Sequence, residues 1–334
     1  MKVVRRNVVR LALGAAVAFA VATQVRAQSV DSRCTGEFAG PGRVGGDACQ
    51  KVIDLYKYMN VQLGTSVAGG SATLGQGGAL GGLGHFAVDL RANAMRASVP
   101  DVAATGVQPG PAGAPDNFAV EARWAGLPAV DGALGIFRGI PLGVTYVGGI
   151  DAIVSAAYLP DITEGSVSVA TPNGSLKLGI GARIGIVEES PLTPGVSFTY
   201  SRRDLPTMSL VADVGSGRSI SVEDYDVHTT AWRLVASKNF AVVGVSAGIG
   251  QDRYQADANL TYNVDGFVPV EPLALGVSPT RTNLFGGVSL NLALVKLVVE
   301  VGRVSGGDVT TYNSFDTEAN AARFYGSLGV RVGY

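Results

Sequence analysis

The sequence predicts an all-β fold: an antiparallel transmembrane β-barrel of about twelve strands, within a range of ten to fourteen, preceded by a short helical segment. The mean hydropathy is +0.27 and only 16% of the residues are charged. No run of about 18 apolar residues follows position 25, so these values do not indicate a membrane helix. Apolar side chains recur instead at every second position, often over more than about ten residues. Globular strands are mostly ~5–6 residues long, whereas strands that span a bilayer need about 9–11.

Residues 1–27 are predicted to be a secretory signal peptide. Cations at four of the first ten positions precede an apolar stretch over residues 11–22, which is too short to span a bilayer. Val25 and Ala27 are the small residues expected before a cleavage site, and Ala20–Ala22 offers a second site. The pair Arg5–Arg6 is typical of the twin-arginine route, but the rest of that motif is missing. We therefore favour export by the general secretory route.

The segment after the cleavage site contains both cysteines, Cys34 and Cys49. An exported chain meets an oxidising compartment, so we expect a disulfide between them. Asp47 can cap a short helix that runs to about Asn60. Residues 28–60 are therefore assigned to a disulfide-stapled N-terminal segment, and residues 61–334 to the barrel.

Strands with one apolar face and one small or polar face follow along the chain. In the run from 175 to 186, for example, the even positions are Leu, Ile or Ala and the odd positions are Ser, Lys, Gly or Arg. The same alternation fits a sandwich with apolar faces turned inward or a barrel with apolar faces turned to lipid; the strand lengths favour the barrel. The expected strands are 83–98, 117–127, 142–159, 175–188, 193–214, 219–238, 241–263, 279–294, 296–305 and 322–334.

Two parts of this assignment leave alternatives open. The Gly-rich residues 61–80 either form a hairpin, which gives twelve strands, or stay outside the wall, which gives ten; we favour twelve. In 241–263 the apolar positions change from odd to even. A one-residue slip exchanges the two faces of a strand, so we infer a bulge near Gly250–Gln251. Alternatively, the second half of this strand has left the membrane.

Connection lengths predict the orientation of the barrel. Tight turns are expected at 188–192, 238–240 and 295–296, and long loops at 160–174, 264–279 and 306–321. In membrane barrels of this kind short turns face the periplasm and long loops face outside. The C-terminus is then periplasmic.

The last strand carries the most specific signal. Apolar residues alternate to the end of the sequence, and the expected assembly strand comprises Phe324, Leu328, Val330, Val332 and Tyr334. This pattern resembles the C-terminal assembly strand of Gram-negative outer-membrane β-barrel proteins, which end on an aromatic residue. The resemblance implies an outer-membrane location, contact with outer-membrane lipid, and recognition by the barrel-assembly machinery.

A second resemblance concerns architecture alone. The N-terminal segment is similar to the hatch of FadL-type hydrophobic-substrate channels, which implies a plug entering from the periplasmic side; a periplasmic extension without function is the alternative. Our leading hypothesis is a passive channel for a small molecule, hydrophobic ones included. A structural or adhesive barrel with a filled lumen, acting through its outer loops, is the second hypothesis.

Charged residues of both signs fall on the predicted inner face. Such charges either line a wet channel or pair across the lumen, and buried charge favours pairing. The candidates are Asp89, Arg91, Glu121, Arg123, Asp151, Lys177, Arg183, Arg203, Arg233, Glu300, Arg323 and Arg331.

Catalytic chemistry has little support in the sequence. His85 and His228 fall on or near strands, and Asp224 and Asp226 lie close to His228, but no nucleophile motif accompanies them. A barrel enzyme acting on envelope lipids is therefore only a third hypothesis. We expect no metal and no cofactor, and the charge balance is not basic enough for nucleic-acid binding.

Overall fold

A computed structural model describes residues 29–35, 44–68, 71, 73–102, 106–109, 114–164, 167–215, 217–264, 266, 268–269, 271–292 and 294–333. The predicted signal peptide and Tyr334, the last residue of the expected assembly strand, lie outside this part. Among the described residues, no helix has the length and apolar character needed to cross a membrane.

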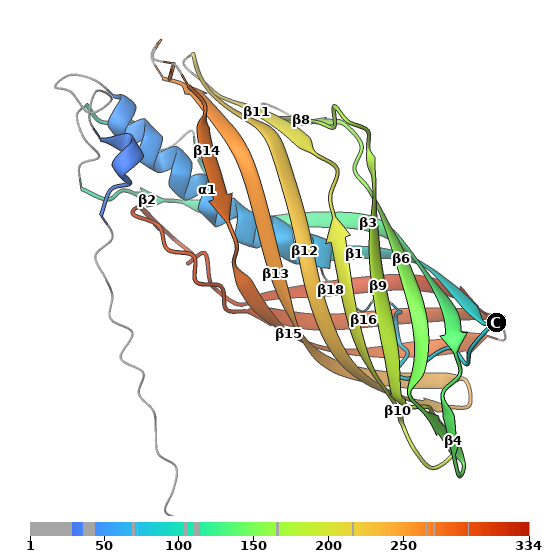
Figure 1. Cartoon of the computed structure of the whole chain (residues 1–334). Helices are drawn as coiled ribbons and strands as arrows, with labels where there is room; N and C mark the ends of the chain where they lie inside the picture. The colour runs from blue at the N-terminus through green and yellow to red at the C-terminus, as the bar shows by residue number, and fades with distance from the viewer. Residues whose placement is uncertain are drawn as a thin grey trace, which may run out of the picture.

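Ten strands of the described chain close into one antiparallel ring (Figure 1). Each strand pairs with its neighbour along the chain, and the pairing of the last with the first closes the ring. The expectation of an antiparallel barrel is thus confirmed. The strands are β1 (Phe86–Pro100), β3 (Val120–Phe137), β6 (Gly149–Tyr158), β9 (Leu176–Val187), β10 (Gly195–Asp204), β12 (Arg218–Phe240), β13 (Val243–Asn263), β15 (Thr280–Leu292), β16 (Val295–Ser305) and β18 (Arg323–Gly333).

The strand number is at the low end of the expected range because the hairpin expected at 61–80 is not formed. Helix α1 (Gly45–Ala68) continues through the first part of that segment. The described residues that follow, up to His85, contain no strand. The glycine-rich residues, which show only weak alternation of apolar and polar positions, therefore form the end of a helix and an irregular segment instead of two strands.

Two other expected strands are divided in the structure. The alternation from Leu142 to Tyr158 is interrupted by Gly148, which adopts φ +74°, so that a small hairpin of β4 (Ile140–Leu142) and β5 (Thr145–Val147) precedes β6. The expected strand 193–214 consists of β10 and β11 (Met208–Gly215).

At one end of the barrel the wall continues as an additional sheet. Strands β12 and β13 are 23 and 21 residues long. Beyond the ring they pair with β14 (Leu273–Val277) and β11, which leads on to β8 (Val167–Ala170) and β7 (Ile162–Glu164). We call this extension the external sheet, because it lies at the end that carries the long loops. A parallel pair of β2 (Asn117–Phe118) and β17 (Ser314–Phe315) lies in two of those loops.

Strand β13 shows why the apolar positions change phase in the sequence. Its odd-numbered residues face outward from Val243 to Asp257, and its pairing with β12 is in register through Gly250 and Gln251. The bulge inferred there is therefore wrong, and the alternative is correct. In the lower half the outward residues, such as Val245 and Ile249, are apolar; in the upper half they are polar, such as Gln255. The strand leaves the membrane near Gln251, and the apolar side chains then face inward.

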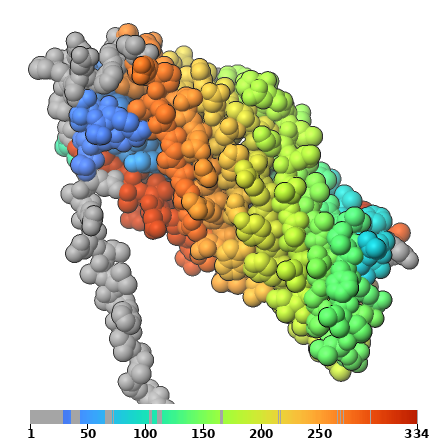
Figure 2. Space-filling model, in the orientation of Figure 1, coloured from blue at the N-terminus to red at the C-terminus, as the bar shows by residue number. Residues whose placement is uncertain are grey.

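Helix α1 enters the barrel from the end with the long loops (Figure 1). Its first turn lies against Tyr262 of the external sheet, whereas Gly64 near its end lies against Tyr254, deeper in the wall. Figure 2 shows the beginning of the helix at the surface beside the external sheet. The chain then continues to the opposite end, where β1 begins. The segment thus enters from the end with the long loops, so the expected entry from the periplasmic side does not agree with the prediction that these loops face outside.

The change of outward polarity along the strands predicts where a charge is tolerated. Val288 pairs with Val245 in the middle of the apolar belt. We expect Val288→Arg to destabilise the folded barrel in lipid vesicles by about 2–4 kcal/mol, because the guanidinium must lie in hydrocarbon. The measurement is equilibrium unfolding, with the heat-modifiable gel shift as the readout of folded protein. Gln255→Arg, above the belt, is the matched control and should be near neutral; similar costs for the two variants would contradict this placement of the membrane.

Candidate functional site

The interior of the barrel is occupied by residues that precede β1 in the chain. The upper part is α1, and the lower part comprises the described residues from Ser71 to His85. We call residues 45–68, 71 and 73–85 together the plug, and the lower part the strap. Charged side chains that point into the barrel therefore contact the plug or one another.

The upper part of the plug packs on the inner face of the external sheet through apolar and aromatic side chains. Val52, Ile53 and Tyr56 of the helix share one buried cluster with residues of β12, β13 and β14. The Tyr56 hydroxyl donates to the Ala256 carbonyl at 2.9 Å, and the Tyr225 hydroxyl donates to Asn60 Oδ1 at 2.7 Å. The external sheet thus serves as a half-shell for the helix outside the lipid belt.

Two long loops hold the opposite side of the helix. Asp54 is fully buried and accepts hydrogen bonds from the backbone amides of Tyr312 and Asn313 at 3.1 and 2.9 Å. Lys51 pairs with Asp47 at 2.8 Å and with Asp116 at 2.5 Å. These contacts tie the helix to the loop before β3 and the loop before β18.

The disulfide Cys34–Cys49 is formed, as expected, with a Cα–Cα distance of 5.4 Å. It fastens the 3-10 turn η1 (Ser32–Cys34) to the first turns of α1. Arg33 Nη1 also donates to the Ala274 carbonyl of β14 at 2.7 Å. The hydrogen bond from the Arg33 side chain lowers the pKa of Asp31 to about 2, so this pair stays charged. The N-terminal segment is therefore attached to both the helix and the external sheet.

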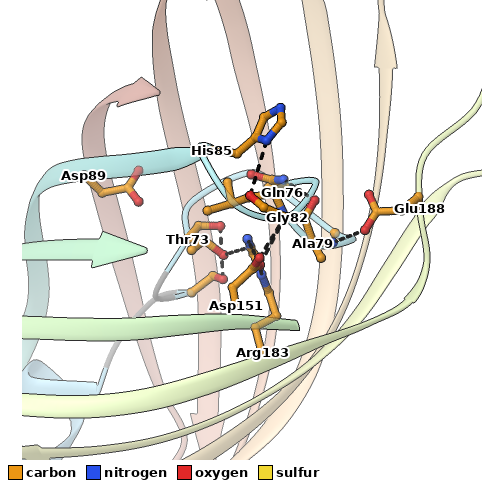
Figure 3. A network of polar contacts seen from close by, with 12 residues as sticks. Thr73, Gln76, Ala79, Gly82, His85, Asp89, Asp151, Arg183 and Glu188 are labelled. Carbon is orange, nitrogen blue, oxygen red and sulfur yellow. Dashed lines mark hydrogen bonds and ion pairs between the residues drawn. The ribbon is translucent and has the colours of Figure 1, made fainter. Parts of the chain in front are cut away.

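A buried ion pair fixes the strap to the lower wall (Figure 3). Arg183 Nη2 lies 2.7 Å from Asp151 Oδ2, and neither side chain is exposed. The same arginine donates to the Thr73 hydroxyl, and Asp151 accepts from the Leu80 backbone amide at 3.1 Å. Each charge of the pair thus contacts the strap as well as its partner on the neighbouring strand.

Further buried pairs join wall strands, two of them between neighbours and one between β10 and β3, which are separated by β6 and β9. Arg91 Nε lies 2.8 Å from Asp131 Oδ2, and Arg203 lies 3.3 Å from the other oxygen of the same carboxylate. Arg233 pairs with Asp252 at 2.6 Å. The charges of these five residues are therefore compensated within the interior, as burial requires.

Backbone groups of the strap are bound by wall side chains down to the periplasmic end. Lys296 Nζ donates to the Gly75 carbonyl at 3.0 Å, the Gly77 amide donates to Ser237 Oγ at 2.7 Å, and the Ala79 amide donates to Glu188 Oε1 at 2.7 Å. The turn residue Glu188 lies outside the spanning strands, and burial raises its pKa. A side chain at Gly329 of β18 would overlap Leu74, which shows how closely the strap lies on the wall.

The predicted interior residues do not all lie inside the barrel. Glu121 and Arg123 are exposed above the belt and pair with each other at 2.7 Å. The upper end of β3 is paired with β1 but extends beyond the last residue paired with β6, so it is open on one side. Their assignment to the lumen is wrong. Lys177 and Arg323 are half-buried, and Arg323 donates to Gln62 of the helix. The remaining predicted positions are buried: Asp89, Arg91, Asp151, Arg183, Arg203, Arg233, Glu300 and Arg331.

Sequence reasoning missed three buried charges of the wall. Asp131 has the inward parity of Ala129 and Ala133 on β3, which could have identified it. The inward direction of Asp252 is concealed in the sequence by the phase change in β13. Arg281, also fully buried, donates to the Ala321 carbonyl at 2.8 Å.

The two histidines lie at different ends of the barrel. His228 Nδ1 lies 2.9 Å from Asp204 Oδ1 on the outer side of the wall above Trp232, and the Asp226 carboxylate accepts from Thr207. His85 lies at the periplasmic end, with its ring 3.3 Å from the Gly82 carbonyl (Figure 3). Among the described residues, no three His, Cys, Asp or Glu side chains are grouped to hold a metal ion.

The buried pair of Asp151 and Arg183 predicts a large cost of neutralising one partner. We expect Asp151→Asn to lower the free energy of unfolding by about 3–5 kcal/mol, because Arg183 is left as an uncompensated buried charge. Equilibrium unfolding in vesicles measures this. Glu121→Gln breaks an exposed pair and should cost no more than about 1 kcal/mol; equal effects of the two variants would show that the interior pair is solvated.

Comparison with known proteins adds little to this geometry. No protein-family model and no curated protein sequence matches the chain. The translocator domain of the autotransporter NalP from Neisseria meningitidis is similar over 75% of this chain and 86% of that domain, with 11% identity and a TM-score of 0.40. Neisserial surface protein A is similar over 75% and 97% (10% identity, TM-score 0.25), and a Pseudomonas aeruginosa FadL homologue over 90% and 95% (7% identity, TM-score 0.25). The assignment of this chain to the outer-membrane β-barrels therefore rests on its own closed ring and apolar outer face.

Proposed function

We propose that this protein is a closed outer-membrane anchor, which holds the external sheet and the disulfide-stapled N-terminal segment at the cell surface. The observation that carries this proposal is the plug, which follows the lumen from the outer end to the periplasmic end and is bound to the wall along its length. The protein then acts through contacts made outside the membrane, as in the structural or adhesive hypothesis.

The construction of the outer end supports this proposal. Strands β12 and β13 are about twice as long as a membrane crossing needs. Their outward residues above the belt, including Gln255 and Asp257, are polar and exposed, whereas their inward residues pack on α1. A wall built only to close a pore has no need of this second, water-facing sheet.

Passive transport is the second candidate, and cavities at the two ends of the plug favour it. A cavity of about 320 Å³ at the periplasmic end is lined by Gln76, Lys296 and Arg331. Another of about 240 Å³ at the outer end lies beside Lys57 and Asp308. The ion-paired layer and the strap lie between them, so transport requires the plug to move.

Conductance separates the two candidates. We expect the purified protein to pass no steady ionic current in planar bilayers, because the plug and its charge pairs fill the lumen. A variant lacking residues 29–79 should conduct, since it removes most of the plug and leaves the ring strands intact. Heat-modifiable mobility checks that this variant still forms a barrel.

A stable open current from the unaltered protein would contradict the proposed anchor and support the channel. If the deletion variant does not fold, Asp54→Ala offers a second test. It removes the carboxylate that holds the loop before β18 on the helix, and it should produce brief openings.

The direction of the plug predicts that the mature N-terminus is on the cell surface. An epitope tag inserted between residues 28 and 29 should be labelled by antibody on intact cells. The same tag inserted at Leu192, in the turn between β9 and β10, should be labelled only after permeabilisation. The reverse labelling would show that the plug enters from the periplasm.

Deletion of an outer loop tests the external role itself. If deletion of 160–174 or of 264–279 changes neither surface binding nor envelope integrity, that result counts against an external role.

A further inference from the structure

The outer wall formed by β3, β1, β18 and β16 contains a hollow within the apolar belt. The hollow measures about 880 Å³, within the range typical of ligand-binding pockets. These four strands follow one another in the ring. The hollow lies on the outside of the barrel, so its existence does not depend on whether the lumen is closed.

Small outward residues create this hollow. The strand register places Gly126, Ala94 and Gly326 side by side in one row across three strands. The next row toward the periplasm contains Ala92 beside Leu328. Elsewhere the belt carries bulky side chains, such as Leu178 and Ile180 on β9, which are more than 60% exposed. Lipid chains must fill the space that the small residues leave, because an empty space against hydrocarbon forfeits van der Waals contacts.

Arginine and aromatic side chains border the hollow at its outer edge. Trp124 pairs with Arg96, and Phe324 pairs with Arg303, one row above the small residues. Trp124 is 78% exposed and Phe324 is 71% exposed. Aromatic rings at this height mark the membrane interface. The two arginines therefore lie where the headgroups of the outer leaflet begin.

Neither arginine at this edge has a partner among the described residues. Arg96 and Arg303 are both exposed, and within this part of the chain no hydrogen bond or ion pair is formed by either side chain. Other outward arginines at this end are bound: Arg202 pairs with Asp204 at 3.2 Å, and Arg253 donates to Ser278 at 2.9 Å. Arg96 and Arg303 are thus positive charges at the membrane interface that form no ion pair with a described acidic residue.

We propose that the hollow binds one molecule of a phosphorylated, multi-acyl glycolipid of the outer leaflet, of the lipid A class. Its acyl chains lie on the row of Gly126, Ala94 and Gly326, and its phosphates contact Arg96 and Arg303. The two arginines stand on strands separated by β18, about 10 Å apart at the usual strand spacing. That separation suits a headgroup with two phosphates, and a floor several strands wide suits several chains. The proposal requires the long loops to face outside, but it does not require the plug to be closed.

Retention of added glycolipid tests this site. The purified barrel in detergent is incubated with lipid A, and native mass spectrometry counts the bound molecules. The unaltered protein should retain one. The double variant Arg96→Gln/Arg303→Gln should bind at least about tenfold more weakly, since a hydrogen bond to a charged group contributes roughly 1.5–3 kcal/mol. Ala94→Trp, which fills the hollow and leaves both charges in place, should also lose the lipid.

Matched controls separate this site from general attraction to the barrel. Arg253→Gln removes an outward arginine from β13, which is not one of the four strands of the hollow, and Ala247→Trp places the same bulk on the belt of that strand; both should retain lipid A as the unaltered protein does. Equal losses in test and control variants would overturn the proposal. So would equal retention of phosphatidylglycerol, or a dimer that covers this wall and excludes lipid. Because these readouts do not involve ionic current, their failure is distinguishable from failure of the proposed anchor.

Discussion

The pairing of β18 with β1 is the contact on which the rest of the structure depends. It extends from Ala87 opposite Gly333 to Met95 opposite Tyr325, and it closes the ring so that each of its strands has a partner on both sides. Backbone amides and carbonyls in hydrocarbon must find partners within the protein, so a membrane sheet has to close. Closure in turn creates an enclosed interior, and the plug takes the space that water would otherwise fill. A charge inside is then poorly hydrated and needs a partner in the protein.

Two different solvents act on the same continuous strands. Along β13 the backbone register does not change at Gly250–Gln251, but the outward side chains change from apolar to polar. Below this height lipid contacts the outside and charged groups face inward; above it water contacts the outside and the apolar groups face α1. A single hairpin therefore supplies part of the transmembrane wall and a cradle for the helix, without a bulge between them.

The interior charges position the plug more than they add stability. A buried ion pair is weak support for stability, because the cost of removing both charges from water offsets most of their attraction. What the pairs do provide is a defined position for the strap, because Arg183 also binds Thr73 and Asp151 also binds the Leu80 amide. Together with the disulfide at the outer end, they fix both ends of the plug. The outer surface differs from this filled and paired interior. There glycine and alanine leave a hollow in the wall, and two arginines beside it have no partner among the described residues.

The sequence by itself determined the antiparallel barrel, the faces of most of its strands and the disulfide, since alternation with period two is a local property of each strand and two cysteines allow one pairing. Parity alone also placed Arg183 and Asp151 on the inner face. Only the tertiary structure decided that the described residues between 61 and 85 fill the lumen, because a glycine-rich segment has no periodicity that separates a strand from a strap. It likewise decided which half of β13 is in the membrane and that Asp252 is buried, because one pattern of side chains is compatible with either solvent. The direction in which the plug enters depends on contacts such as Tyr262 with Gly45, more than two hundred residues apart in the chain, which no local pattern encodes.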